Sequence, residues 1–196
     1  MKEEQKIKYY EVEYSYINDE NKKEDLKTLV KMLPDYYFDM PASTTGKYHP
    51  KFASTKNGLV KHTKLATRIA YELLNNEITG AKFSDNEKDL IIMAIVLHDG
   101  LKCGDPKEKY TRFDHPLLAS KFVMENKDKL SLSTDEIRNL CSMIETHMGQ
   151  WTYDTYSKKE VLPKPTTELQ RFVHMCDFLS SKKFLNAEFD GYNLKN

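Results

Sequence analysis

Imidazole and carboxylate side chains fall on the inward faces of four expected helices. They are His62, His98, Asp99, His147 and Asp177. Except for Asp99, each lies three or four positions from an apolar residue of the same helix, and this spacing puts two residues on one helix face. Asp99 directly follows His98. Burying so many polar groups is costly unless each finds a partner. A shared divalent cation would be a partner for all of them.

The types of these side chains indicate which cations would suit. Cys103, Cys141 and Cys176 form no CxxC pair, which argues against a closed thiolate zinc site and against a disulfide framework. Imidazole nitrogens and carboxylate oxygens suit Mn²⁺, Fe²⁺, Co²⁺ or Mg²⁺, with positions left for water. Ni²⁺ is a further ion to test. We expect one or two divalent ions.

Periodic apolar residues predict the helices that would position this site. The expected helices cover about 21–33, 57–76, 84–100, 116–126, 133–144 and a segment from 167. Capping boxes begin two of them, at Ser84 and Ser133, and Pro116 suits a first helical position. Six or seven helices with short loops predict an all-α, compact, bundle-like domain over residues 21–185.

The first 20 residues show a different pattern. Tyr10, Val12, Tyr14 and Tyr16 alternate with polar residues, which is the period of a half-buried strand. Residues 1–20 are therefore predicted to form a small β-like appendage. Its partner strand would be 151–156 or would come from a second subunit. Residues 186–196 are expected to be a C-terminal tail, and the sequence leaves the oligomeric state open.

Length and charge restrict the class of protein. The 196 residues suit one domain, and 30 basic side chains balance 30 acidic ones, so no overall field draws the chain to polyanions or anionic membranes. The longest apolar run, 90–97, is far shorter than the about 20 residues that cross a bilayer. The first residues lack the apolar region of a secretory signal. We expect a soluble cytoplasmic protein with no membrane partner.

Three segments taken together resemble the HD superfamily of metal-dependent phosphohydrolases. The segments are Gly58-Leu-Val-Lys-His62-Thr, Ile95-Val-Leu-His-Asp-Gly-Leu-Lys102 and Val173-His-Met-Cys-Asp-Phe-Leu-Ser-Ser-Lys182. They give the order H…HD…D that names the superfamily, and the likeness covers about residues 38–183. It implies an HD-type helical bundle in which His62, His98, Asp99 and Asp177 bind one ion.

Two further histidines bear on the number of ions. His115 and His147 lie between the doublet and Asp177, as in members of the superfamily that hold two metals. The resemblance implies that Asp99 bridges to a second ion held by His115 and His147. The alternative is that these two histidines line the substrate pocket.

A weaker similarity points to the HD region of certain bacterial 3′→5′ exoribonucleases. It rests on Phe38-Asp-Met-Pro-Ala-Ser43, Tyr48-His-Pro50 and Asn57-Gly-Leu-Val-Lys-His62. Pro50 stands where those enzymes have a second histidine, and Asn57 where they have a glycine.

Such a site would hydrolyse a phosphoester, because paired ions lower the pKa of a bound water and neutralise charge on phosphate. Asp99 and Lys102 are the expected catalytic residues, and the resemblance implies that Lys102 touches the substrate phosphate. Lys56, His49, Arg112 and Lys102 are the expected substrate-binding residues. Residues 41–70 hold six basic side chains and no acidic one; of these, Lys61 and Lys64 are expected to face solvent.

We therefore expect a metal-dependent phosphohydrolase acting on a nucleotide or short oligonucleotide. One alternative is a 3′→5′ nuclease on short single strands of nucleic acid. Another is a catalytically silent HD domain whose metal only holds the bundle together, as a sensor or an assembly partner.

Overall fold

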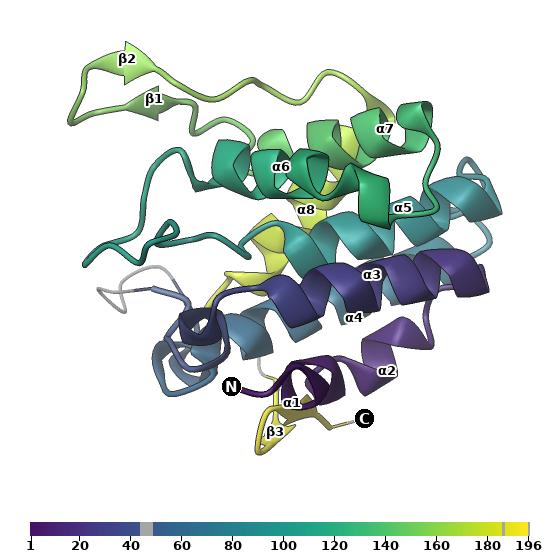
Figure 1. Cartoon of the computed structure of the whole chain (residues 1–196), viewed down its shortest axis with the longest axis horizontal. Coiled ribbons are helices and arrows are strands. Elements are labelled where there is room, and N and C mark those ends of the chain that lie inside the picture. The colour runs from purple at the N-terminus through teal and green to yellow at the C-terminus, as the bar shows by residue number, and fades with distance from the viewer. Residues whose placement is uncertain (44–48, 186, 196) are drawn as a thin grey trace.

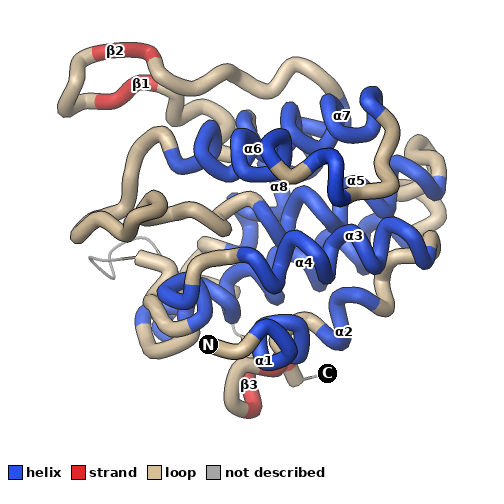
Figure 2. The backbone as a smooth tube through the Cα atoms, in the orientation of Figure 1, coloured by secondary structure: helices blue, strands red, loops and turns tan. Residues whose placement is uncertain are grey.

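The computed structural model describes residues 1–43, 49–185 and 187–195, and this part of the chain is mostly helical (Figures 1 and 2). Its α-helices are α1 Glu3–Lys8, α2 Glu11–Tyr14, α3 Glu20–Met32, α4 Gly58–Asn75, α5 Asp85–Leu97, α6 His115–Glu125, α7 Thr134–Glu145 and α8 Glu168–Ser180. The expectation of a helical chain is confirmed.

Short elements connect the helices. Single 3₁₀ turns cover Asp35–Phe38, Lys51–Ser54 and Lys127–Lys129. Strands β1 (Tyr153–Asp154) and β2 (Lys159–Glu160) form an antiparallel hairpin, and so do β3 (Phe189–Asp190) and β4 (Asn193–Leu194). The β1–β2 hairpin projects from the bundle, whereas both chain ends lie beneath α3 and α4 (Figure 1).

Helix α5 is the centre of the bundle. Every residue from Asp89 to Leu97 is buried, and α5 packs against α4, α7 and α8. Helix α6 covers α7, and α3 lies on the other side of α5 (Figure 1). A helix that is apolar on all sides must be enclosed in this way. The segment that follows it, which begins with His98 and Asp99, is therefore buried as well.

The predicted helix starts are confirmed. Ser84 and Ser133 each accept a hydrogen bond from the backbone N–H three residues on, while Glu87 and Glu136 complete the two capping boxes. Thr167 caps α8 in the same way. These caps satisfy backbone donors that would otherwise lack partners at the helix ends.

The predicted N-terminal strand is wrong. Residues 10–16 include α2, and the buried positions are Tyr10, Tyr14 and Ile17, which have helical spacing, while Val12 is 49% exposed. The tyrosines therefore fit both the two-residue period of a strand and the spacing of a helix. Packing on α3 and α4 selects the helix. Residues 151–156 pair with 159–160 instead of with the N-terminus.

The expected exposure of Lys64 is also wrong. Its Nζ lies 2.6 Å from Glu13 Oε2, and both side chains are buried between α2 and α4. The N-terminal segment thus adds an ion pair as well as apolar side chains to the core.

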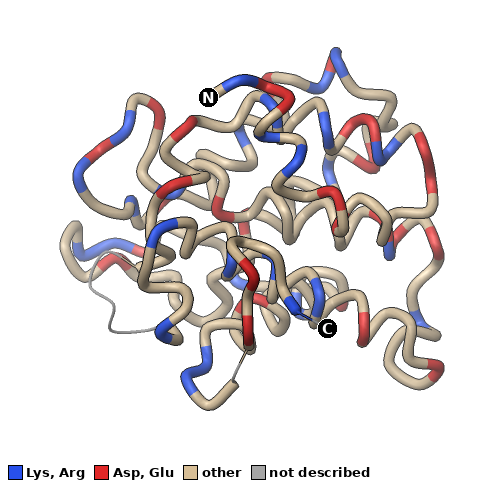
Figure 3. The backbone as a smooth tube through the Cα atoms, turned by 90° about the horizontal axis from the view of Figure 1, so that it is seen from below, with Lys and Arg blue, Asp and Glu red and all other residues tan. Residues whose placement is uncertain are grey.

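Two other features agree with the sequence. Cys103, Cys141 and Cys176 are buried free thiols. Among the described residues, no helix has the length and apolar character needed to span a membrane. Acidic and basic residues alternate along much of the chain (Figure 3).

Candidate metal centre

Five helices or their ends bring six predicted ligands together. His62 lies on α4, His98 and Asp99 end α5, His115 begins α6, His147 follows α7, and Asp177 lies on α8. All of them are buried except Asp177, whose side chain is 20% exposed. The six side chains span 116 positions of sequence, so only the folded bundle can join them.

Asp177 and one oxygen of Asp99 form the first group with two histidines. His62 Nε2 lies 2.9 Å from Asp177 Oδ1 and 3.8 Å from Asp99 Oδ2. His98 Nε2 lies 3.5 Å from Asp177 Oδ1 and 3.4 Å from Asp99 Oδ2. The donor atoms of His62, His98 and Asp177 lie within 4.8 Å of one another, and so do those of His98, Asp99 and His147, so each set of three could hold an ion.

The other oxygen of Asp99 faces a second pair of histidines. His115 Nε2 lies 2.9 Å from Asp99 Oδ1, and His147 Nε2 lies 3.8 Å from the same oxygen. The two Nε2 atoms are 3.2 Å apart. Asp99 therefore presents one oxygen to each pair of histidines, which is the arrangement of a bridging carboxylate.

Hydrogen bonds at Nδ1 orient these rings. His98, His115 and His147 each donate Nδ1–H to a backbone carbonyl three residues earlier, at 2.6, 2.7 and 2.8 Å. His62 Nδ1 lies 3.0 Å from Ser180 Oγ, and that hydroxyl donates to the carbonyl of Asp177. With Nδ1 used as a donor, the neutral ring turns the lone pair of Nε2 toward the centre.

The centre has unsatisfied acceptors, and this tests whether a cation fits. His62 Nε2, His98 Nε2 and Asp99 Oδ1 are buried without a hydrogen-bond partner among the described residues. Lone pairs on nitrogen face carboxylate oxygens at hydrogen-bond distance, which is repulsive unless a proton or a cation lies between them. Neutral imidazole and carboxylate are donor types that divalent transition ions bind, so the residues fit the expected ions.

Protonation is the competing way to satisfy these atoms. Burial alone would lower the pKa of His98, but Asp99 and Asp177 outweigh it and raise that pKa to about 10. Burial and the neighbouring His98 and His115 lower the pKa of His147 to about 3. Without metal, one histidine of the centre would thus carry a proton and another would be neutral.

The two carboxyl groups stay ionised in either case. Burial acts to raise the pKa of Asp99, but Lys102 and His98 hold it well below its usual range. Burial acts likewise on Asp177, but the neighbouring imidazoles of His62 and His98 hold that pKa well below its usual range. Two negative charges therefore remain in the centre for cations to balance.

Two of the predicted substrate-binding residues lie at the centre. Lys102 Nζ contacts Asp99 Oδ2, the oxygen that faces His62 and His98. The ring of His49 packs edge-on against that of His62, with centroids 4.9 Å apart, and its buried Nδ1 has no hydrogen-bond partner among the described residues. Burial lowers the pKa of His49 to about 3, so its ring is neutral.

The side chains of Lys56 and Arg112 have other partners. Lys56 is exposed, and its Nζ lies 3.2 Å from Asp39 Oδ1. Arg112 pairs with Asp114 and Glu108, while its backbone carbonyl accepts the hydrogen bond from His115. The predicted roles of both side chains in substrate binding receive no support from these contacts. Lys47, in the same basic segment, lies outside the described residues.

The structure shows two further contacts around the predicted ligands, of which the sequence prediction missed Ser180. Ser180 holds the ring of His62, and its position three residues after Asp177, on the same helix face, is the signal that could have indicated it. His174 donates Nδ1–H to the carbonyl of His147 at 2.7 Å. Its ring lies where a Cβ on Gly149 would be, 2.1 Å from the nearest ring atom.

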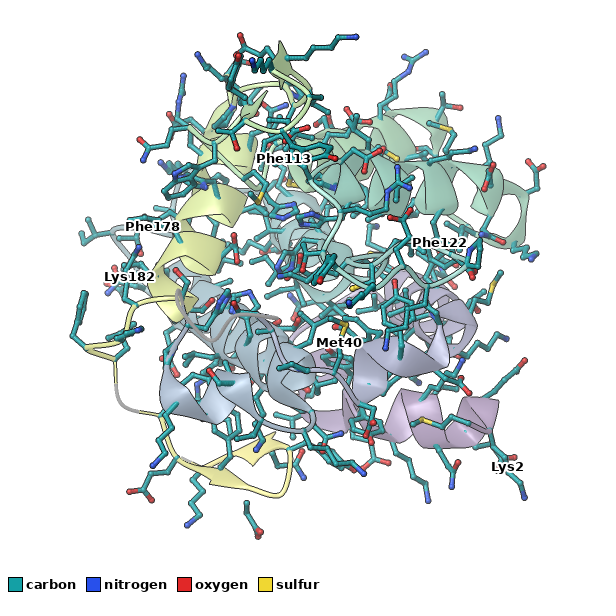
Figure 4. The ribbon with its side chains drawn as sticks, turned by 90° about the vertical axis from the view of Figure 1, so that its left-hand side faces the viewer. Lys2, Met40, Phe113, Phe122, Phe178 and Lys182 are labelled. Atoms are coloured by element: carbon teal, nitrogen blue, oxygen red, sulfur yellow. The ribbon has the colours of Figure 1, made fainter. Side chains whose placement is uncertain are left out.

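Solvent reaches the centre on the side of Asp177. Its neighbour Phe178 stacks on Trp151, which is 44% exposed, with centroids 5.8 Å apart. Phe113 and Met40 lie near the middle of the face seen in Figure 4, and Phe178 lies on its left-hand side. Asp177 is the most exposed of the six side chains.

Comparison with protein-family models, with curated proteins and with solved structures finds no match to this chain.

Proposed function

We propose that this chain is a divalent-metal-dependent phosphohydrolase of the HD type that acts on a phosphoester of a nucleotide or short oligonucleotide. The observation that carries the proposal is the position of Asp99. Its two oxygens face two separate pairs of histidines, and three of those rings are held by the backbone carbonyl three residues earlier. This arrangement supports the reading of the sequence in which Asp99 bridges two ions.

The residues of the chain would act as follows. Bound divalent ions supply a hydroxide near neutral pH and neutralise charge on the phosphate. His62, His98, Asp177 and Asp99 would hold one ion, and His115 and His147 with Asp99 the other. Lys102 holds Asp99 Oδ2 in place and offers its remaining N–H groups to a phosphate oxygen.

The centre itself favours a small substrate. Among the described residues, Lys102 is the only Lys or Arg whose side chain forms an ion pair with the six-residue cluster. Binding of long nucleic acids commonly draws on many phosphate contacts across a basic face. A nucleotide or the end of a short strand requires fewer phosphate contacts. Cleavage of short single strands from the 3′ end is therefore an alternative within the same chemistry.

Charge balance favours a second candidate, a catalytically silent domain. A protonated His98 with Lys102 would neutralise Asp99 and Asp177 without metal. The centre would then stabilise the bundle, as in a sensor or an assembly partner. Against this, a proton on His98 leaves the Nε2 atoms of His115 and His147 facing each other.

Metal content and phosphoester hydrolysis, followed by chromatography of the nucleotide products, separate these candidates. The chain is purified without chelator, analysed for metals, and then assayed with Mn²⁺, Fe²⁺, Co²⁺, Ni²⁺ and Mg²⁺ against a panel of nucleotides and dinucleotides. We expect bound metal and turnover, which Asp99→Asn and Asp177→Asn abolish while circular dichroism stays unchanged. Asp135→Asn, an exposed position on α7, is the matched control. No turnover on any substrate, whether or not metal is bound, would favour the silent domain.

A further inference from the structure

A cavity of about 500 Å³ lies next to the metal centre and contains none of its ligands. Its lining consists of Pro50, Lys51, Phe52, Thr55, Lys61, Lys183, Leu185 and Ala187. The volume is within the usual range for small-molecule sites. The cavity joins the start of α4 to the segment after α8, so three parts of the chain build it.

The charge of this lining is one-sided. Lys51, Lys61 and Lys183 contribute cations and no carboxylate lines the cavity. Among the described residues, none of these three lysines forms an ion pair, whereas Lys56, Lys64 and Arg68 of the same basic segment do. Unpaired ammonium groups around one cavity favour an anion.

The cavity also has an apolar side. Phe52 packs on Phe189 with ring centroids 4.9 Å apart, and Lys61 Nζ lies 5.7 Å from the centroid of Phe189. Pro50 and Leu185 extend this surface. A ligand that combines phosphate with a flat apolar ring would match both sides, as nucleotides do when bases lie on aromatic side chains.

The cavity is close to the metal centre because the same segments form both. Pro50 follows His49, whose ring packs on His62, and Lys61 precedes His62. Lys183 comes three residues after Ser180, the hydrogen-bond partner of His62. Consecutive Cα atoms are about 3.8 Å apart, so these neighbours cannot be distant.

We propose that this cavity binds a second nucleotide, with its phosphate on Lys51, Lys61 and Lys183, next to the nucleotide whose phosphoester is cleaved. The substrate is then a nucleotide chain of at least two residues and not a single mononucleotide. That link to the substrate rests on the proposed function, but binding in the cavity does not, because none of the six metal ligands lines it.

Binding without metal tests the cavity apart from catalysis. A fluorescein-labelled pentathymidylate is titrated with the full-length protein in EDTA, and the dissociation constant is read from fluorescence anisotropy. We expect the combined change Lys51→Gln, Lys61→Gln and Lys183→Gln to weaken binding about tenfold or more. The matched control carries the same charge change at Lys8, Lys31 and Lys127, which are on α1, α3 and the 3₁₀ turn after α6, and should change binding less than about twofold.

Several outcomes would overturn the inference. They are no binding by the unaltered protein, equal weakening in both triple variants, or competition by tripolyphosphate as strong as by unlabelled pentathymidylate. Circular dichroism checks the fold of each variant, and the three single substitutions replace the triple variant if it unfolds. Binding through the cavity without hydrolysis of pentathymidylate by the metal-loaded protein would contradict the proposed function and leave this inference standing.

Discussion

His115 and His147 face each other with their Nε2 atoms 3.2 Å apart, while each uses Nδ1 to donate to a backbone carbonyl. Two neutral rings in these tautomers direct lone pairs at one another, and His147 is held neutral by burial and by its histidine neighbours, which lower its pKa to about 3. A cation that both nitrogens bind, together with Asp99 Oδ1, would remove the repulsion.

The first prediction concerns the number of metal ions. We expect two divalent ions per chain in protein purified without chelator, and one in His115→Gln, because the first group of ligands is intact in that variant. Elemental analysis with a protein concentration from amino-acid analysis gives the ratio. One ion in the unaltered protein, with no change in His115→Gln, would instead place His115 and His147 in a substrate pocket.

The second prediction concerns Ser180. Removing its hydroxyl leaves Nδ1 of His62 without its partner and frees the ring to turn, and loss of such an orienting partner commonly weakens metal binding about 10- to 100-fold. Ser180→Ala should therefore weaken binding of the first ion within this range, measured by competition with a chelating dye. Ser181→Ala is the matched control, since Ser181 bonds only the carbonyl of Phe178. Equal affinities in the two variants would contradict an orienting role.

Local signals in the sequence were sufficient for most of the helices. Apolar spacing predicted α3 to α8, and capping boxes predicted where α5 and α7 begin. The convergence of His62, His98, Asp99, His147 and Asp177 was predictable for a related reason: polar side chains on buried faces must share a partner. The geometry of the cluster supports that argument, while metal binding itself stays a prediction.

Long-range pairing was beyond the local pattern. Lys64 resembles any helical lysine until α2 brings Glu13 against it. Tyr10 and Tyr14 fit a strand by alternation and a helix by spacing, and only packing on the bundle decides between them. Each of these errors concerns a partner that is set by the fold and not by neighbouring residues.

The third prediction concerns the buried pair of Lys64 and Glu13. Burial raises the pKa of Glu13 and lowers that of Lys64, so each charge is disfavoured without the other. Lys64→Met should lower the free energy of unfolding by about 3 to 5 kcal/mol, because it leaves a buried carboxylate unpaired. Urea denaturation measures the change.

The double variant Glu13→Leu, Lys64→Met controls for this change. Replacing both charges by apolar side chains removes the desolvation cost of the pair, so stability should return to within about 1 kcal/mol of the unaltered protein. A double variant as unstable as Lys64→Met alone would show that the loss comes from packing and not from the unpaired charge.

The fourth prediction concerns pH and His49. Its pKa is about 3 in the folded chain against an ordinary value of 6.5, because burial disfavours the charged ring. Below about pH 6.5 the unfolded state therefore takes up a proton that the folded state does not. The contribution of the neutral ring to stability is lost as the pH falls from about 6.5 toward 3.

In EDTA, the unaltered protein should lose more stability between pH 7 and pH 5 than His49→Gln, by about 1 to 2 kcal/mol. Urea denaturation at the two pH values gives the difference. An equal loss in both proteins would mean that the ring of His49 is protonated or exposed in the folded chain.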